Sequence, residues 1–519
     1  MFSNNSHGKN STSRKNNKPL SSESDSVEVY DDDEATLPIP EEIIYPGLVL
    51  KNEYVLLKKI GFGNNAAVWM TYQISTQSYF AIKIQDNQCY NDGCREVAII
   101  KKINSYCKEN NTKNICIVKM LDFFVYEEDD ETKYVCSVYD LYAGSIQMLL
   151  CEGKYKYGLP IPVVKNIIRQ LLIALSTLHM DLSVIHTDIK PENILFKGIP
   201  EYQTRIIESF EKTNFQKKYD VILQRYKGND SKFTDELECL AIESVYELDT
   251  IDTSFTGCEE FHPDDENLDE DDFIEGDDDN EYDYDSSDSS DNQCIFNERD
   301  QSVNDAIENL DYSKMHDLDI EVDYDFKSVL NNRENSQDKK EMIDDKYVKN
   351  CQVALTDFGN SYFFSKRTKN EVQDRRYRAP EIILDFNYKY ACDIWSVSCV
   401  TFELLTGFAL FEPDTHPLNK DIQHLYLMEK NLGKIPLVMK KASKRSKFLF
   451  DKKRNYHIKN LEPFSSCPLK NRLVNQFLFT DTDAEDIYDF IIQGLHYDPT
   501  ERPNAIEMLA HPWLKEFKY

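Results

Sequence analysis

An acidic tract interrupts the chain and limits which residues can share one folded core. Between Glu259 and Asp291, 18 of the 33 residues are Asp or Glu, and the tract contains no Lys or Arg. Such a composition buries too little apolar surface to offset the entropy that is lost on ordering. We therefore predict that residues 197–349 form an acidic, mostly disordered insert, with helix expected only over 205–226.

The residues on either side of this insert have the patterns of a strand-rich part followed by a helical part. Short runs rich in β-branched and aromatic residues predict antiparallel strands, and apolar residues at helical spacing predict helices. This order predicts an α+β fold with a small β-rich lobe and a larger helical lobe. We expect a disordered polar tail at 1–48, the small lobe and the start of the larger one at 49–196, and the rest at 350–519. Strands are expected at 54–61, 66–74, 78–85, 115–126 and 134–142, and helices at 94–106 and 163–180.

The composition excludes several classes of protein. The formal net charge of −32 disfavours direct contact with nucleic acid, because phosphate backbones attract Lys and Arg. The first residues lack the apolar region of a secretory signal, and no apolar run approaches the roughly 18 residues of a membrane helix. The 13 cysteines include no CxxC pair, which predicts free thiols in a reducing compartment. We therefore expect a soluble, intracellular and monomeric protein without membrane contact.

The loop from His186 to Leu195, with the sequence HTDIKPENIL, carries the most chemical information. Phosphoryl transfer needs a carboxylate that aligns the acceptor hydroxyl and takes its proton, and Asp188 is the candidate. It also needs oxygen ligands for Mg²⁺ and a cation that offsets the charge of the transferring group. Asn193 and Lys190 supply these groups, so this short loop predicts a site for phosphoryl transfer.

A second group of residues fits the binding of nucleotide phosphates. Gly61 and Gly63 lie between two predicted strands, where glycine lets backbone N–H groups approach phosphate oxygens. The glycines alone are a weak signal, because glycine also marks ordinary hairpins. Lys83, on the strand about 20 residues later, could hold the α- and β-phosphates. It needs a carboxylate to orient it, and Glu96 on the next predicted helix is the candidate.

A third group follows the insert. Asp357, in the sequence DFG after the apolar run 353–355, is the expected main ligand of Mg²⁺. Glu381 ends the sequence YRAPE and is expected to form a buried ion pair with Arg502. Asp393 is expected to brace the catalytic loop. Each residue alone has an ordinary structural explanation, but all of them in this order favour one enzyme site.

These motifs resemble those of eukaryotic protein kinases, over about 54–196 and 350–514. The resemblance implies a bilobal kinase fold with ATP and Mg²⁺ in the cleft between the lobes. It implies that Asp188 is the catalytic base, assisted by Lys190, and that Asn193 and Asp357 bind the metal. It also implies that Tyr139 lies at the back of the adenine pocket. The residues implied to bind the nucleotide are Ile60, Gly61, Gly63, Ala66, Val68, Ala81, Lys83, Glu96, Tyr139 and, through hinge backbone groups, Asp140 and Tyr142.

Several features resemble the SR-protein kinases, a family in the CMGC group. They include Thr187 in the catalytic loop, the sequences ALTDFGN, QDRRYR, TGFALFEPD and HPWL, and the position of the acidic insert. This resemblance implies protein substrates rich in Arg and Ser, in particular splicing factors, and a location in cytoplasm and nucleus. For the insert, a solvated spacer without a specific role and a segment that retains the enzyme in the cytoplasm through partners both stay open.

Thr187 stands where most kinases have an arginine that pairs with a phosphorylated activation loop. A threonine cannot make that ion pair, so we predict activity without phosphorylation of the activation loop. Asp374 stands where the family has a threonine, and it could pair with Lys190 or repel Asp188.

The acidic docking groove of the family is also altered. The aligned positions are Phe408, Gln423 and Lys430, so processive phosphorylation of long Arg-Ser tracts is in doubt. Nearby acidic residues are candidates to replace the lost carboxylates, namely Asp414, Asp421 and Glu429.

Two alternatives to an SR-protein kinase stay open at this point. One is another CMGC kinase that phosphorylates Ser before Pro or other substrates. The other is a non-catalytic scaffold with a kinase fold.

Overall fold

The computed structural model describes residues 44–63, 66–112, 115–127, 132–151, 153–226, 231–251, 348, 351–364, 372–413, 419–459 and 468–515. The chain divides into two compact units, Met1–Ile43 and Ile44–Tyr519. The first unit lies outside the described residues, so the structure gives no view of the predicted tail over 1–43. Leu48, at the end of that predicted tail, is buried.

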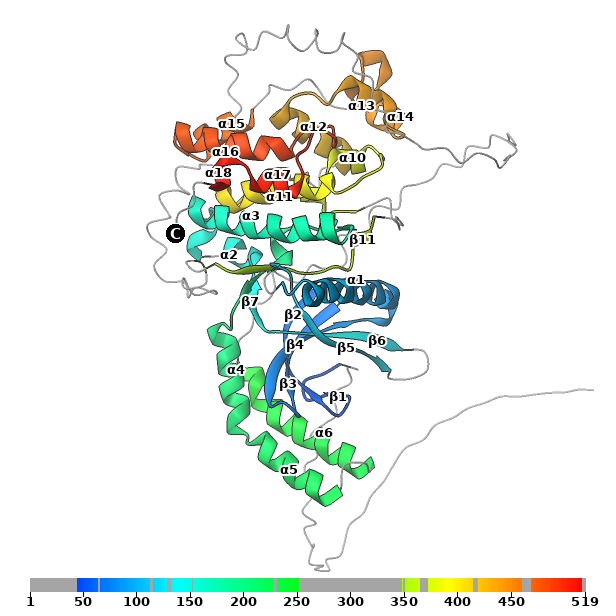
Figure 1. Ribbon diagram of the computed structural model, residues 1–519, viewed down its shortest axis with the longest axis vertical. Helices are drawn as coiled ribbons and strands as arrows, with labels where there is room; N and C mark the ends of the chain where they lie inside the picture. The colour runs from blue at the N-terminus through cyan, green and yellow to red at the C-terminus, as the bar shows by residue number, and fades with distance from the viewer. Residues whose placement is uncertain are drawn as a thin grey trace, which may run out of the picture. The chain divides into compact units, whose positions relative to one another are not determined.

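A six-stranded antiparallel sheet forms the small lobe, with the strand order β1-β2-β3-β4-β6-β5 (Figure 1). All of these strands except β1 were predicted, although β5 begins later than the apolar run suggested. The strands are β1 (Val49–Leu50), β2 (Tyr54–Gly63), β3 (Ala66–Gln73), β4 (Ser78–Gln85), β5 (Met120–Glu127) and β6 (Lys133–Tyr139).

Helix α1 (Tyr90–Glu109) lies against β5 and β6 and contains the whole predicted helix. Val97, Ile100 and Ile103, whose spacing predicted the helix, are buried on its inner face. Glu96 lies on this buried face as well, which places a carboxylate beside the sheet.

Helices build the larger lobe around α3 (Ile161–Ser176) and α11 (Ala391–Thr406), which contact each other. Every α11 residue from Cys392 onward is buried. The helix ends at Gly407, whose φ of +78° is left-handed, and a Cβ there would lie 2.1 Å from the Lys156 carbonyl oxygen. The other helices are α2 (Gln147–Cys151), α10 (Pro380–Ile383), α12 (Lys420–Leu432), α13 (Leu437–Ala442), α14 (Ser446–Leu449), α15 (Leu469–Asn471), α16 (Asp481–Gly494), α17 (Ala505–Leu509) and α18 (Pro512–Lys515).

Helix α3 begins the one described segment, Ile161–Asp181, that is long and apolar enough to cross a membrane. Half of its most apolar window is buried inside the larger lobe. Val164, Ile168 and Leu172 belong to the core there, so we assign the segment as a core helix.

Short strands join the two halves of the chain. Strand β9 (Ile194–Lys197) precedes the insert, β10 (Val353–Leu355) follows it, and the two pair antiparallel with β7 (Tyr142–Ser145) on the other side of β9. The insert therefore starts and ends beside paired strands. The remaining strands form two pairs, β8 (Val184–Ile185) with β11 (Tyr362–Phe363) and β12 (Phe450–Asp451) with β13 (His457–Ile458).

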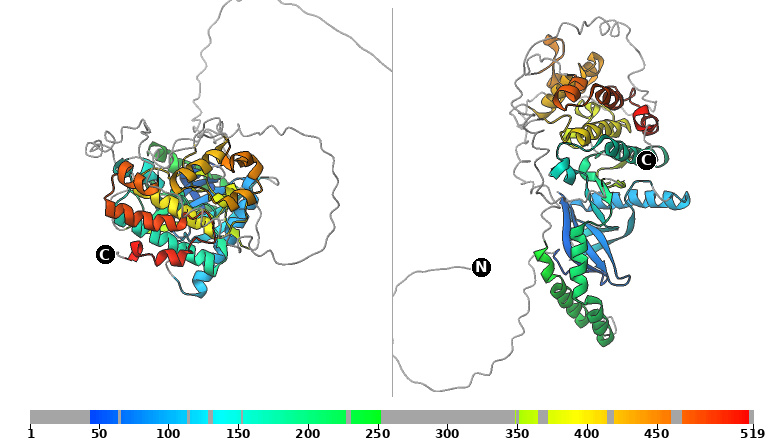
Figure 2. Two further views of the ribbon diagram at one scale, coloured as in Figure 1. Left: turned by 90° about the horizontal axis from the view of Figure 1, so that it is seen from above. Right: turned by 90° about the vertical axis from the view of Figure 1, so that its left-hand side faces the viewer.

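The first part of the insert contains helices, and the segment 252–347, where disorder was predicted, lies outside the described residues. Helix was expected over 205–226, and α4 (Glu201–Lys212) and α5 (Phe215–Tyr226) confirm it. Helix α6 (Ser231–Val245) was not predicted. The three helices pack beside the sheet of the small lobe, away from the larger lobe (Figures 1 and 2). The acidic tract lies outside the described residues.

Apolar burial explains why α4, α5 and α6 are ordered. One core contains residues from these helices and from β1, β2 and β3. Its aromatic part includes Tyr72 of β3, whose ring lies 5.1 Å from that of Phe210 and 5.8 Å from that of Phe215. The buried members from the insert are Tyr202, Ile206, Phe210, Phe215, Ile222, Phe233, Leu237, Leu240, Ala241, Val245 and Leu248.

Candidate active site

The strands of the small lobe align the residues predicted to bind a nucleotide. Gly61 of β2 is opposite Val68 of β3, which is opposite Lys83 of β4. Ala81 is opposite Tyr139 of β6. Ala81 also lies on the same face as Lys83, because the two are two residues apart on β4. Figure 1 shows this sheet next to the larger lobe, with α1 between its edge strands and that lobe.

The loop between β2 and β3 is described at its two ends. Ile60 is half-buried, Gly63 is exposed, and Gly63 is opposite Ala66. Ile60, Gly61, Gly63 and Ala66 thus occupy the strand ends where the sequence placed the phosphate-binding turn.

Lys83 is held by two carboxylates. Its Nζ donates to Glu96 Oε1 and Oε2 at 3.0 and 2.9 Å, and to Asp357 Oδ1 at 2.9 Å. Burial alone would lower the pKa of Lys83, but Asp357 and Glu96 hold that pKa above its usual value. The Lys83 ammonium is therefore charged. The predicted pair of Lys83 and Glu96 is present, and the structure adds Asp357 to it.

Asp357 follows β10 and is ionised. Burial would raise its pKa, but the Lys83 ammonium outweighs burial and lowers the pKa of Asp357 to about 2. Its φ of +62° is unusual for a residue with a side chain. Phe358 is fully buried, with its ring 5.0 Å from that of His186. This packing fixes the Asp357 carboxylate beside Lys83.

The catalytic loop brings its three predicted residues together. The Asn193 amide nitrogen donates to Asp188 Oδ2 at 3.0 Å and to the Asp188 carbonyl oxygen at 2.8 Å. Lys190 Nζ lies 3.3 Å from Asp188 Oδ2 and 4.0 Å from Asp374 Oδ2. Asp374 thus pairs with Lys190, which was one of the two outcomes left open for this residue.

Asp393 braces this loop, as predicted. Its Oδ2 accepts from the backbone N–H of His186 at 2.8 Å, and its Oδ1 accepts from that of Thr187 at 2.8 Å. A ring nitrogen of His179 lies 2.9 Å from Oδ2. Asp393 is fully buried, so these hydrogen bonds replace the hydration that its carboxylate loses on burial.

The predicted pair of Glu381 and Arg502 is also present. The two guanidinium nitrogens of Arg502 donate to the two oxygens of Glu381, each at 2.7 Å. Both side chains are fully buried. This bidentate geometry fastens α10, at the end of the activation segment, to the core of the larger lobe.

Residues between β6 and β7 connect the two lobes. Tyr139 is buried, whereas Asp140 is exposed and Tyr142 is half-buried. The backbone carbonyl of Tyr142 accepts from the side chain of Gln203 on α4 at 2.9 Å. No sequence pattern indicates this contact, which joins the insert to the predicted adenine-binding segment.

Two further carboxylates near the catalytic loop were missed. Glu403 of α11 is buried, and its Oε2 accepts from the Tyr377 hydroxyl at 2.7 Å. Glu192 is adjacent to Asn193 in the catalytic loop, and its charge helps to raise the pKa of Glu403. No sequence spacing could reveal this pair, because the two residues are 211 positions apart.

Two of the three acidic residues proposed for a docking groove, Asp421 and Glu429, are paired within the protein. Asp421 is buried and forms ion pairs with Arg375 and with Arg445, the latter at 2.6 Å. Glu429 is buried and pairs with Lys440 at 2.6 Å. The prediction that these two could replace lost groove carboxylates is therefore wrong, because their charges are already compensated internally.

The other groove positions are consistent with a groove that lacks carboxylates. Phe408 packs its ring 6.4 Å from that of Tyr157, and Gln423 and Lys430 lie on α12. Asp414 lies outside the described residues.

The donor set suits a nucleotide with a divalent metal. Asn193 uses its amide nitrogen on Asp188, which leaves its oxygen for a metal, and Asp357 offers an ionised carboxylate. No group of three or more His, Cys, Asp or Glu side chains that could hold an ion occurs within the described ranges. These two ligands therefore need oxygens from phosphates and water, as is usual for Mg²⁺ in phosphoryl transfer.

Comparison with known families decides the identity of this site. The family model described as "Protein kinase domain" matches residues 54–208 and 342–514. The chain belongs to the protein kinase family. The two matched parts leave out residues 209–341, which belong to the insert, so the insert splits the kinase domain. The bilobal fold and the use of ATP with a divalent metal follow from membership.

Relatives define the kind of kinase. A serine/threonine kinase of Acanthamoeba polyphaga mimivirus is 54% identical over 92% of this chain and 90% of its own length. Protein kinase dsk1 of Schizosaccharomyces pombe is 27% identical over 89% of this chain and 80% of its own. Human SRSF protein kinase 3 is 24% identical over 90% and 87%. The protein is therefore a serine/threonine protein kinase related to SR-protein kinases, and that predicted resemblance is confirmed.

Proposed function

We propose that this kinase phosphorylates Ser within Arg-rich segments of protein substrates, splicing factors among them. The supporting observation is the cluster of carboxylates beside the catalytic loop. The pKa of the buried Tyr377 hydroxyl is raised first by burial and then by three nearby negative charges, those of Glu403, Glu192 and Asp374. Carboxylates gathered around Tyr377, with Glu192 in the catalytic loop itself, favour a substrate with a cationic side chain near its acceptor Ser.

Burial makes the charged forms of Glu403 and Glu192 unfavourable unless a cation binds them. Burial raises the pKa of Glu403 to about 7 and also raises the pKa of Glu192. Glu192 Oε2 is buried and has no hydrogen-bond partner among the described residues. A substrate Arg would compensate both charges, since a guanidinium is always protonated and can bind two carboxylates.

Glu403→Gln tests this substrate proposal. Glutamine keeps an acceptor for Tyr377 but removes the charge, so KM for an Arg-Ser peptide should rise by about 30-fold or more, or about 2 kcal/mol. A Ser peptide without Arg is the matched control, and its KM should stay within about twofold. Equal changes in KM for both peptides would show that Glu403 does not bind the substrate arginine.

The same residue predicts a pH dependence. The pKa of Glu403 is raised to about 7, so Glu403 is neutral below that pH and charged above it. KM for the Arg-Ser peptide should therefore fall between pH 6 and pH 8, and this fall should be absent in Glu403→Gln. Initial rates over this pH range measure the effect, and identical profiles for the two proteins would contradict it.

We also propose that the kinase is active without phosphorylation of its activation loop. Thr187 is buried and has a φ of +64°. Its hydroxyl donates to the carbonyl oxygen of Asn360 at 2.6 Å, directly after the DFG sequence. The catalytic loop thus holds the start of the activation segment without a phosphate.

Phosphatase treatment tests this second proposal. The fully dephosphorylated chain should keep kcat within about twofold of the untreated chain, because the Thr187 contact needs no phosphate. Mass spectrometry verifies that all phosphate has been removed. A large loss of kcat that is restored by rephosphorylation would refute activity without phosphorylation.

We further propose Mg²⁺ as the metal held by Asn193 and Asp357, a monomeric enzyme, and a location in cytoplasm and nucleus. The hard oxygen donors of both side chains support Mg²⁺. The alternative, a CMGC kinase directed to Ser before Pro, would prefer a Ser-Pro peptide to an Arg-Ser peptide.

A further inference from the structure

A cation-rich surface lies on the larger lobe, away from the catalytic loop. Residues 440–459 contain nine Lys or Arg and one acidic residue, Asp451, in a chain whose net charge is −32. Three of these cations have carboxylate partners, namely Lys440 with Glu429, Lys444 with Asp385 and Arg445 with Asp421. The other six have no carboxylate within 4.0 Å in the part of the chain that the structure describes.

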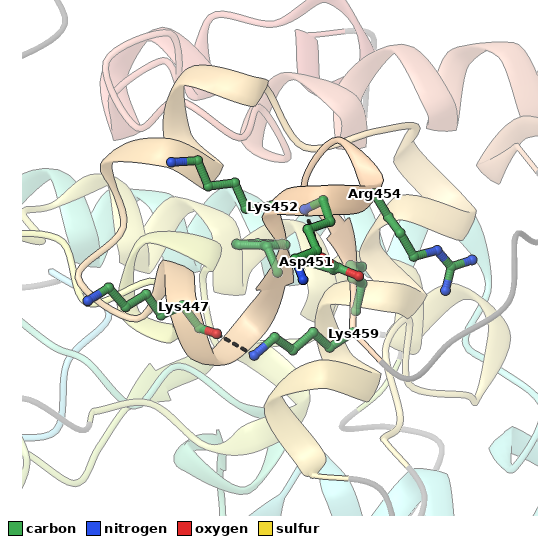
Figure 3. Close-up of a pocket in the computed structure, with 8 residues that line it drawn as sticks. Lys447, Asp451, Lys452, Arg454 and Lys459 are labelled. Atoms are coloured by element: carbon green, nitrogen blue, oxygen red, sulfur yellow. Dashed lines mark hydrogen bonds between the residues drawn. The ribbon is translucent and has the colours of Figure 1, made fainter.

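Five of these six cations surround one cavity of about 610 Å³ next to the hairpin of β12 and β13 (Figure 3). We call it the basic cavity. It is also lined by Phe450, Asp451 and Ile458. The five cations are Lys447, Lys452, Lys453, Arg454 and Lys459.

The backbone that presents these cations is fixed. Phe450 and Ile458 are buried and anchor the hairpin, and Asn455 and Tyr456 close it with positive φ angles of +53° and +56°. Asp451 caps the turn by accepting from the Lys453 N–H at 2.8 Å. The turn therefore presents three adjacent cationic side chains to solvent, those of Lys452, Lys453 and Arg454.

The arrangement suits an extended polyanion better than a single small anion. In Figure 3 the side chains of Lys452 and Arg454 extend in different directions, while Lys459 donates to the Lys447 carbonyl. Cations spread in this way cannot converge on one phosphate. They can instead contact successive charges along an acidic peptide.

We propose that the basic cavity binds the acidic tract of the same chain, in its part from Asp277 to Asp291. Eight of these 15 residues are Asp or Glu, and none is Lys or Arg. The described chain ends before the tract at Ile251 and resumes at Val348, so 25 residues precede this part and 56 follow it. At about 3.3 Å per residue they span up to about 80 and 180 Å.

Tethering favours this occupant over an acidic segment of another protein, since binding within one chain loses less translational freedom. The contact would also place negative charge near the activation segment. Ser443 and Arg445 donate to the carbonyls of Leu384 and Ile383 at the end of α10.

Carbodiimide cross-linking of the full chain tests this proposal independently of kinase activity, because it joins Lys to Asp or Glu only at direct contact. An equal mixture of ¹⁴N- and ¹⁵N-labelled protein shows by mass spectrometry which links are within one chain. We expect links from Lys447, Lys452, Lys453 or Lys459 to residues 277–291, all isotopically unmixed, and at least fivefold weaker at 0.5 M NaCl because salt screens exposed charges.

Two matched triple variants make the test specific. Lys452→Glu, Lys453→Glu and Arg454→Glu together should abolish the links at Lys447 and Lys459, whereas Lys212→Glu, Lys217→Glu and Lys218→Glu should leave them unchanged. The control lysines are exposed on the insert helices. Links of residues 277–291 that favour the control lysines, no links at the basic cavity, or isotopically mixed links would each overturn binding within the chain. Unchanged melting temperatures verify that the variants fold.

Discussion

Replacing Asp188 with Asn should lower kcat for phosphate transfer by about 10²–10⁴-fold while the Kd for ATP changes little. Asp188 is 3.0 Å from the Asn193 amide nitrogen and 3.3 Å from Lys190, so its carboxylate is positioned within the catalytic loop. Lys83, by contrast, makes its hydrogen bonds with Glu96 and Asp357. The loss should therefore appear in the chemical step and spare nucleotide binding.

Single-turnover kinetics and a nucleotide titration separate these two effects. Asp374→Asn is the matched control, because Asp374 lies 4.0 Å from the same Lys190, whereas the amide of Asn193 donates to Asp188. We expect that control to lower kcat by less than about tenfold. A kcat of Asp188→Asn equal to that of the unmodified protein would exclude Asp188 as the base.

Arg502→Met should destabilise the protein by about 3–5 kcal/mol, because it leaves the Glu381 carboxylate buried without its partner. Both side chains are fully buried, and two hydrogen bonds of 2.7 Å join them. Chemical unfolding of the larger lobe, followed by intrinsic fluorescence, measures the loss. Trp395 reports it well, since the Arg502 guanidinium lies 5.0 Å from its ring.

Two controls distinguish the effect of breaking a buried ion pair from that of breaking an exposed ion pair. Lys470→Met breaks the exposed pair with Glu485 and should leave the unfolding midpoint almost unchanged, because water screens exposed charges. Glu381→Met combined with Arg502→Met removes both charges, so it should recover part of the stability lost in Arg502→Met. If Arg502→Met and Lys470→Met had equal effects, the buried pair would not be a structural anchor.

The catalytic residues could be predicted because each belongs to a short motif. Asp188, Lys190 and Asn193 lie within six consecutive residues, and their distances follow from the local backbone. The pairs of Lys83 with Glu96 and of Glu381 with Arg502 each join separate elements within one lobe, but the motifs that contain them fix their roles in the kinase fold.

Other features depend on the tertiary structure and could not be predicted. The approach of Glu192 to Glu403 depends on how α11 lies against the catalytic loop. Asp421 and Glu429 look available for a groove in the sequence, because no local pattern shows that Arg445 and Lys440 compensate them. Helix α6 had a signal that was overlooked, since Phe233, Leu237, Leu240 and Ala241 recur at helical spacing beside the acidic tract.

The most direct test of the account is transfer of labelled phosphate from ATP by the dephosphorylated protein to two peptides, one of Arg-Ser repeats and one with Ser-Pro. Asp188→Ala is the control for a contaminating kinase. We expect rapid transfer to the Arg-Ser peptide that is lost in Asp188→Ala, with little transfer to the Ser-Pro peptide. Preference for the Ser-Pro peptide would contradict the proposed reading of arginine by Glu192 and Glu403, while the chain would remain a serine/threonine kinase.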